Sequence, residues 1–148
     1  MRIAHLIAAG LLLPLVAHAD HSDDTLKFYL AKSDLVVLGT IKNEPVGNTS
    51  VAAVVGYDCN VEVADVLKGD QTLKGKTIRL GIVRFESGEN DQYPPIKKNT
   101  KCILFLKQFG APEEKSWGTT DLWFSVQYPN SMMAKSLKRL ARQEAASQ

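Results

Sequence analysis

The sequence has few of the residues on which most hydrolytic and metal-dependent sites rely. Two of its three histidines, His5 and His18, lie in an apolar N-terminal segment, so only His21 remains beyond it. A domain without an internal histidine has no Ser–His–Asp or Cys–His arrangement and no histidine-based zinc site. The two cysteines, Cys59 and Cys102, are too few for a zinc site of four thiolates. We therefore expect a protein that is not an enzyme and that needs no metal or cofactor.

The sequence also lacks a phosphate-binding motif and a strong charge of one sign. It has no Gly-rich phosphate loop and no nucleophile elbow. Its 18 Lys and Arg face 16 Asp and Glu, and only Arg2 precedes residue 20, which leaves a net charge of +1 for residues 20–148. A balance so close to zero points to no charged partner, and we expect no nucleic acid among its ligands.

The first nineteen residues have the three parts of a secretory signal peptide. Arg2 supplies a positive start, residues 3–16 form an apolar run, and the small-residue pattern Ala17-His18-Ala19 ends it. The run is too short to span a membrane comfortably. We predict a signal peptide at residues 1–19 and one mature domain at residues 20–148, which is periplasmic or secreted and has no transmembrane segment.

Hydrophobic periodicity predicts a mainly β domain with a helix at each end. Ser22 is placed to cap a short helix ending near Ser33, and a longer amphipathic helix is expected over residues 132–145. Five strands are predicted, at residues 35–41, 51–67, 77–82, 102–106 and 122–128. The first is apolar enough to be covered on both faces, and residues 46–50 have the composition of a turn.

No alternation of strands with helices supports a parallel sheet. Gly39, inside the first predicted strand, indicates a bulge or a sharp bend. Several short strands with curvature at glycines are typical of small closed sheets. We therefore expect a single five-stranded, OB-like antiparallel barrel.

Three segments carry a family resemblance. Residues 33–41, 61–69 and 102–106 resemble small exported bacterial domains that look like the netrin-like OB-barrel of the tissue inhibitors of metalloproteinases. The resemblance implies a fold more than an activity, because its motifs are strand and turn patterns. Those inhibitors chelate the protease zinc through an N-terminal cysteine, whereas no cysteine precedes Cys59 here. Metalloproteinase inhibition by that route is therefore not implied.

The two cysteines have the parity of their apolar neighbours on two predicted strands. An even number of cysteines in an exported protein usually indicates a disulfide. We predict a bridge between Cys59 and Cys102, and two buried free thiols are the alternative.

The last predicted helix has a basic row and an apolar stripe. The basic row is a possible partner-binding surface and consists of Lys135, Lys138, Arg139 and Arg142. The apolar stripe consists of Met133, Leu137, Leu140 and Ala141. Such a helix usually docks its apolar side on the domain and leaves its charges in water. Contact with an acidic partner or a membrane surface is the alternative.

Other candidate sites are less specific. Trp117 and Trp123 are candidates for a ligand-stacking surface, and packing in the core explains them equally well. Glu62 and Asp121 are candidates for acid–base chemistry, although nothing in the sequence brings them together. His21, second in the mature chain, could help an N-terminal amine to hold copper(II), but we expect a solvated terminus there.

Taken together, these features predict an exported, non-enzymatic binding or inhibitor-like module of the cell envelope. The expected partner is another envelope or extracellular protein. The alternatives are a carboxylate-dependent hydrolase of envelope polymers and a structural component of the envelope.

Overall fold

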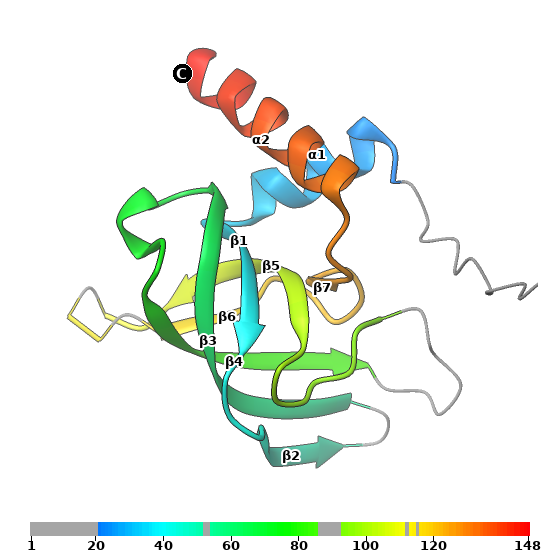
Figure 1. Cartoon of the computed structure of the whole chain (residues 1–148), viewed down its shortest axis with the longest axis vertical. Coiled ribbons are helices and arrows are strands. Elements are labelled where there is room, and N and C mark those ends of the chain that lie inside the picture. The colour runs from blue at the N-terminus through cyan, green and yellow to red at the C-terminus, as the bar shows by residue number, and fades with distance from the viewer. Residues whose placement is uncertain (1–20, 52–53, 86–92, 112, 115) are drawn as a thin grey trace, which may run out of the picture.

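Seven strands and two α-helices make up the domain in the computed structural model, which describes residues 21–51, 54–85, 93–111, 113–114 and 116–148. The predicted signal peptide lies outside these residues. In chain order the elements are α1 (Asp23–Lys32), β1 (Leu35–Ile41), β2 (Val46–Val51), β3 (Val54–Lys68), the 3-10 turn η1 (Gln71–Leu73), β4 (Thr77–Phe85), β5 (Lys101–Phe109), β6 (Ser116–Thr119), β7 (Val126–Gln127) and α2 (Ser131–Ala146). The fold is mainly β, as predicted, and α1 and α2 lie together on one side of the sheet (Figure 1).

Five of the strands form a ring. Their order is β1–β3–β4–β6–β5, and β5 pairs with β1 to close it. β2 pairs with β3, and β7 pairs with β5. All pairings are antiparallel except that of β4 with β6, which is parallel at Leu80–Trp117 and Gly81–Gly118. The prediction of a wholly antiparallel sheet is wrong at this pair. In a ring with an odd number of strands, neighbouring directions cannot alternate all the way round.

The helix ends are capped by polar side chains. Ser22 Oγ accepts a hydrogen bond from the amide of Thr25 at 3.3 Å, and Ser33 ends α1. Asn130 Oδ1 accepts from the amide of Met132 at 2.9 Å and starts α2. Both predicted helices are therefore confirmed, with side-chain oxygens on otherwise unpaired amides. In the described residues, no helix has the length and apolarity needed to cross a membrane.

The strands bury apolar side chains on two faces. The cluster on the inner face of the ring consists of Leu35, Val37, Ile41, Cys59, Val61, Val63, Val66, Ile78, Leu80, Ile82, Cys102, Leu104, Leu106 and Val126. The cluster between the ring and the helices consists of Leu26, Leu30, Val36, Leu67, Ile103, Phe105, Phe124, Met133, Leu137 and Leu140. β1 and β5 contribute to both clusters. This double coverage is why their sequences are continuous apolar runs, as predicted for the first strand.

Gly39 marks a bulge, as predicted. The pairing of β1 with β3 changes register between Leu38 and Gly39. On the ring, Gly39 lies opposite Cys102 of β5 and Val63 of β3. Leu38 lies opposite Asp65 and Gly39 opposite Val63, so the extra residue of the bulge, Ala64, is on β3. The bulge bends β3 where it faces Gly39, and such a bend helps a sheet to curve into a ring.

Two predicted segments differ from the structure. Residues 46–50 form β2 rather than a turn, and β2 pairs back on β3 as a hairpin. The long strand predicted over residues 51–67 is β3 (Val54–Lys68), except that Val51 belongs to β2. In segment 122–128, only Val126–Gln127 is a strand. Asp121 Oδ1 accepts from the amides of Trp123 at 2.8 Å and Phe124 at 2.7 Å. This side chain bends the backbone and takes amides that a strand would use for pairing.

Candidate functional site

The predicted disulfide is absent from the structure. Cys59 and Cys102 are both free and buried in the inner cluster, which is the alternative that the sequence left open. Cys59 lies on β3 and Cys102 on β5, with β1 between these strands on that side of the ring. Strands separated by a third are roughly 9–10 Å apart, whereas a disulfide needs Cα atoms within about 7 Å. Burial raises the pKa of each thiol to about 12, so neither is a reactive thiolate near neutral pH.

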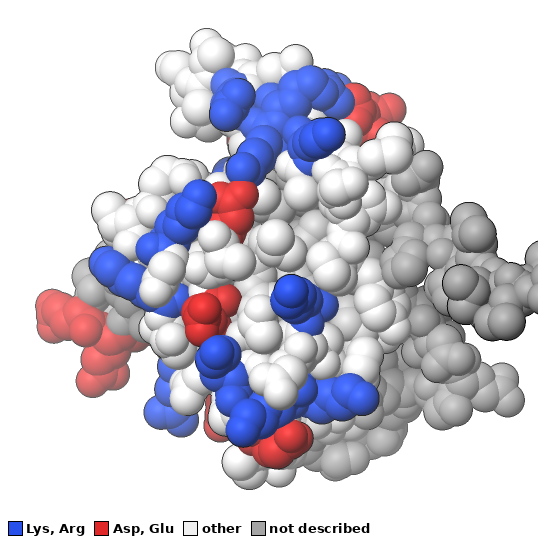
Figure 2. Space-filling view, viewed as in Figure 1, with Lys and Arg blue, Asp and Glu red and all other residues white. Residues whose placement is uncertain are grey.

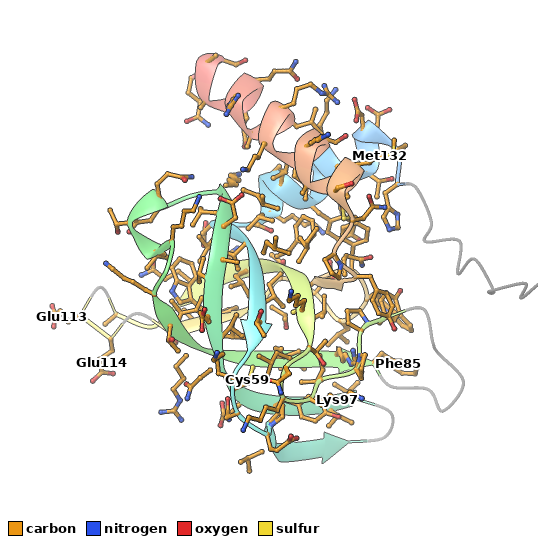
Figure 3. The ribbon with its side chains drawn as sticks, viewed as in Figure 1. Cys59, Phe85, Lys97, Glu113, Glu114 and Met132 are labelled. Carbon is orange, nitrogen blue, oxygen red and sulfur yellow. The ribbon has the colours of Figure 1, made fainter. Side chains whose placement is uncertain are left out.

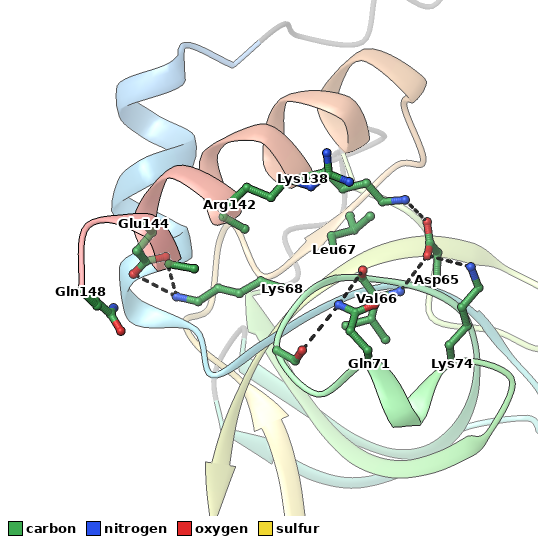
Figure 4. Close-up of a pocket in the computed structure, with 13 residues that line it drawn as sticks. Asp65, Val66, Leu67, Lys68, Gln71, Lys74, Lys138, Arg142, Glu144 and Gln148 are labelled. Carbon is green, nitrogen blue, oxygen red and sulfur yellow. Dashed lines mark hydrogen bonds and ion pairs between the residues drawn. The ribbon is translucent and has the colours of Figure 1, made fainter.

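A groove lies between α2 and the end of β3, with η1 on its far side (Figure 4). Its volume is about 560 Å³, within the range of about 300–1,000 Å³ that is usual for ligand sites. Four cationic and two anionic side chains line it: Lys68, Lys74, Lys138, Arg142, Asp65 and Glu144. The groove therefore has an excess of positive charge, although the domain as a whole is nearly neutral.

Asp65 joins the two sides of the groove. Its Oδ2 lies 2.6 Å from Nζ of Lys138 on α2, and its Oδ1 lies 3.3 Å from Nζ of Lys74, which follows η1. Oδ1 also accepts from the amide of Val66 at 3.1 Å. The hydrogen bond from Lys138 lowers the pKa of Asp65; burial opposes this effect and Lys74 adds to it. The carboxylate is therefore held in its charged form.

Lys68 connects the groove lining to both helices. Its Nζ donates to the carbonyl oxygen of Leu30 at 2.6 Å and lies 3.0 Å from Oε2 of Glu144. The first contact puts a cation at the C-terminal end of α1, where it interacts favourably with the helix dipole; the same carbonyl oxygen also accepts from the amide of Ser33 at 3.1 Å. The second ties β3 to α2. Because its charge is already used twice, Lys68 has a structural part in the groove.

Arg142 is the cation with the most freedom to bind a ligand. It is exposed, and within the described part of the chain it has neither an ion pair nor a side-chain hydrogen bond. It stands one helical turn after Lys138, so the two share a side of α2. Figure 2 shows Lys and Arg side chains gathered over α2, with an acidic side chain between them and the basic side chains nearer η1.

The structure divides the predicted basic row into different roles. Lys138 pairs with Asp65, and Arg139 pairs with Asp23 of α1 at 2.6 Å. Lys135 is exposed and lies outside the groove lining. The apolar stripe of the same helix is buried on the ring, which confirms the predicted docking. Of the four predicted residues, only Lys138 and Arg142 meet in the groove.

The two tryptophans do not form one surface. Trp117 packs against the inner cluster and lies opposite Leu80 of β4. Trp123 is half-exposed and stacks on Phe85, with ring centroids 4.6 Å apart. Phe85 is labelled in Figure 3. Leu80 and Phe85 are five residues apart on β4, or about 17 Å at 3.3 Å per residue. A joint stacking face for these tryptophans is therefore not supported.

The predicted carboxylate pair is also separated. Glu62 lies opposite Thr77 at the start of β4 and pairs with Lys42 at 2.8 Å. Asp121 caps the turn that bonds to Phe85 at the other end of β4. Eight residues of strand, about 26 Å, separate these levels. The structure therefore gives Glu62 and Asp121 no common site.

The N-terminal histidine packs on the protein. His21 lies edge-on to Phe124, with ring centroids 4.8 Å apart, rather than in a fully solvated terminus. In the ranges that the structure describes, no three His, Cys, Asp or Glu side chains gather as metal ligands would. Neither a protein-family model nor a curated protein matches this sequence.

Sequence reasoning identified the α2 side of the groove and missed the β3 side. Asp65, Lys68 and Lys74 were not candidates, because an Asp or Lys near a turn is usually only a solvated charge. One sequence feature could have indicated the β3 side: the pair Lys68-Gly69 ends the long strand, and both residues line the groove beside α2.

Proposed function

We propose that the protein is an exported, netrin-like domain whose ring of strands is a small OB-like barrel. The closure of β5 on β1 and the bulge at Gly39 support this fold. The signal peptide pattern at residues 1–19 supports export to the periplasm or the medium. Intact mass of the exported protein tests this part: a chain starting at Asp20 supports it, and a chain that keeps residues 1–19 contradicts it.

The domain acts as a binding module, and the groove beside α2 is its ligand site. The ligand is an acidic, extended segment of another envelope or extracellular protein. The single observation that carries this proposal is the set of four cations around two carboxylates, with Arg142 exposed and unpaired in the described residues. An anionic segment along the groove would meet Arg142 and the free N–H donors of Lys74 and Lys138.

The electrostatics of the groove favour binding over hydrolysis. A general acid needs a carboxyl pKa raised toward neutral pH. In the groove, contact with Lys138 lowers the pKa of Asp65 instead. Glu144 forms an ion pair with Lys68. Asp65 is thus held as an anion by its lysines, and Glu144 is already paired with Lys68, which suits a site that recognises charge.

A fluorescein-labelled hexaglutamate peptide tests this site by fluorescence anisotropy at low and high salt. Arg142→Glu is expected to weaken binding about fivefold to tenfold at low salt, because it reverses a charge that faces the ligand. Arg79→Glu is the matched control, since it makes the same change on exposed β4 outside the groove. Equal effects of the two variants, or no binding of the peptide, would contradict the proposal.

A second measurement separates a protein partner from a lipid surface. Vesicles of phosphatidylglycerol and phosphatidylcholine are tested by cosedimentation with the wild-type protein and the Arg142→Glu variant. Vesicle binding that depends on Arg142 and outcompetes the peptide would overturn the choice of an acidic protein segment as ligand.

A further inference from the structure

The centre of the basic groove is already filled by a carboxylate of the protein itself. Asp65 bonds Lys138 at 2.6 Å and Lys74 at 3.3 Å, the two lysines that approach each other across the groove. The Asp65 side chain is 25% exposed, against 60% for Lys74 and 40% for Lys138. The carboxylate therefore lies deeper than the ammonium groups, which carry their remaining donors toward solvent.

We propose that Asp65 is a resident competitor that sets the specificity of this groove. This inference rests on the proposed function of the groove as a site for an acidic segment. Asp65 occupies the position between Lys74 and Lys138 where a single small anion would bind best. It also repels any second anion placed beside it.

The consequence is selection by the number and spacing of carboxylates on the ligand. A lone anion meets two lysines whose charge Asp65 partly neutralises. An extended acidic segment makes further contacts along the groove, including the one with Arg142, and so compensates for the repulsion from Asp65. The groove therefore rejects small anions such as phosphate and accepts chains that carry several carboxylates.

Asp65→Asn is the direct test, because the amide keeps an acceptor oxygen for Val66 and the lysines while removing the charge. Binding of the hexaglutamate peptide is expected to become about threefold to tenfold tighter, as a negative charge a few ångströms from the ligand is removed. Inorganic phosphate, measured by its competition with the peptide, is expected to gain at least as much. Asp65→Ser is the second variant if the amide alters folding, which thermal denaturation reports.

Glu62→Gln is the matched control. It removes one carboxylate from another lysine ion pair on the same strand, outside the groove. A twofold change or less is expected in this control. If loss of a structural ion pair only disordered the groove, binding of the peptide would become weaker. Tighter binding that is seen only in the Asp65 variants therefore indicates that Asp65 competes with the ligand for the lysines.

The outcomes separate this inference from the proposed function. If the wild-type protein binds the peptide and both Asp65 variants bind it equally well or more weakly, the competitor role is overturned and the proposed site remains. Binding that appears only in the Asp65 variants would overturn the proposed function, because the natural groove then binds no acidic segment, and would still support Asp65 as the group that blocks the groove. No binding by any of the proteins overturns both proposals.

Discussion

Replacing Gly39 with alanine tests whether the close approach of β1 to β3 at the bulge requires a glycine. A methyl group at this position would overlap Cγ1 of Val61 and lie 3.1 Å from the carbonyl oxygen of Glu62. Val61 is fully buried in the inner cluster, so its side chain has little space to move away. The carbonyl belongs to the backbone of β3 and can move only if β1 and β3 separate.

The expected cost follows from these two contacts. Overpacking a filled core costs about 1–3 kcal/mol, and we expect Gly39→Ala to lie at the upper end because backbone as well as side chain must shift. Gly81→Ala is the matched control on β4, where an added methyl meets nothing within 4 Å. That change is expected to be neutral or to stabilise by about 0.4–1 kcal/mol, through the loss of freedom in the unfolded chain.

Urea denaturation followed by tryptophan fluorescence measures both variants. With a slope of about 1.5–2 kcal/mol per molar, Gly39→Ala is expected to lower the unfolding midpoint by about 1–2 M. Gly81→Ala is expected to leave the midpoint unchanged or raise it slightly. Midpoints for the two variants that agree within experimental error would refute the reasoning about the bulge.

Three further predictions follow from buried and ion-paired groups. Leu137→Ala is expected to lower the free energy of unfolding by about 2–4 kcal/mol in the same assay, because this side chain of α2 is fully buried. Met132 is exposed on the same helix, and Met132→Ala is expected to change the free energy of unfolding by less than about 0.5 kcal/mol. Cys59 and Cys102 are expected to resist Ellman's reagent in the native protein and to give two thiols per chain when denatured without reductant; no reactive thiols in that state would indicate a disulfide. The pKa of Asp65 is lower in the folded protein than in the unfolded chain, where it is near 4. The carboxylate therefore stabilises the fold above about pH 4, and this contribution is lost as pH falls through the pKa of the folded protein. The difference in free energy of unfolding between wild type and Asp65→Asn should shrink over that acid range.

The elements that the sequence predicted well are those whose pattern has one physical cause. β1 is buried on both faces, and its continuous apolar run has no other explanation in a domain of this size. Ser22 and Asn130 cap α1 and α2 with local bonds that depend on a few neighbouring residues. Gly39 could be recognised because glycine is unusual inside a strand, although the atoms that leave no room for a side chain there belong to β3.

The elements that were predicted wrongly depend on long-range pairing or on a side chain that bonds the backbone in place of a neighbouring strand. β2 has the composition of a turn and becomes a strand only because β3 is long enough to pair with it. Segment 122–128 alternates like a strand, but Asp121 bonds the backbone of its first half. Trp117 lies on β6, a short strand whose position between β4 and β5 is set by closure of the ring.

The groove shows why a row of charges on a helix does not by itself define a binding surface. From their spacing in the sequence, the four basic residues of α2 cannot be told apart. In the fold, Arg139 forms an ion pair with Asp23 and Lys138 forms one with Asp65. What remains for a ligand depends on the acids that other elements bring nearby, and these come from α1 and from the end of β3. Arg142 stays available because no carboxylate of the described residues pairs with it, and Glu144, two positions along the same helix, is bound by Lys68. The candidate site is therefore a product of tertiary structure, and its strength depends on how firmly Asp65 and Glu144 hold their lysines.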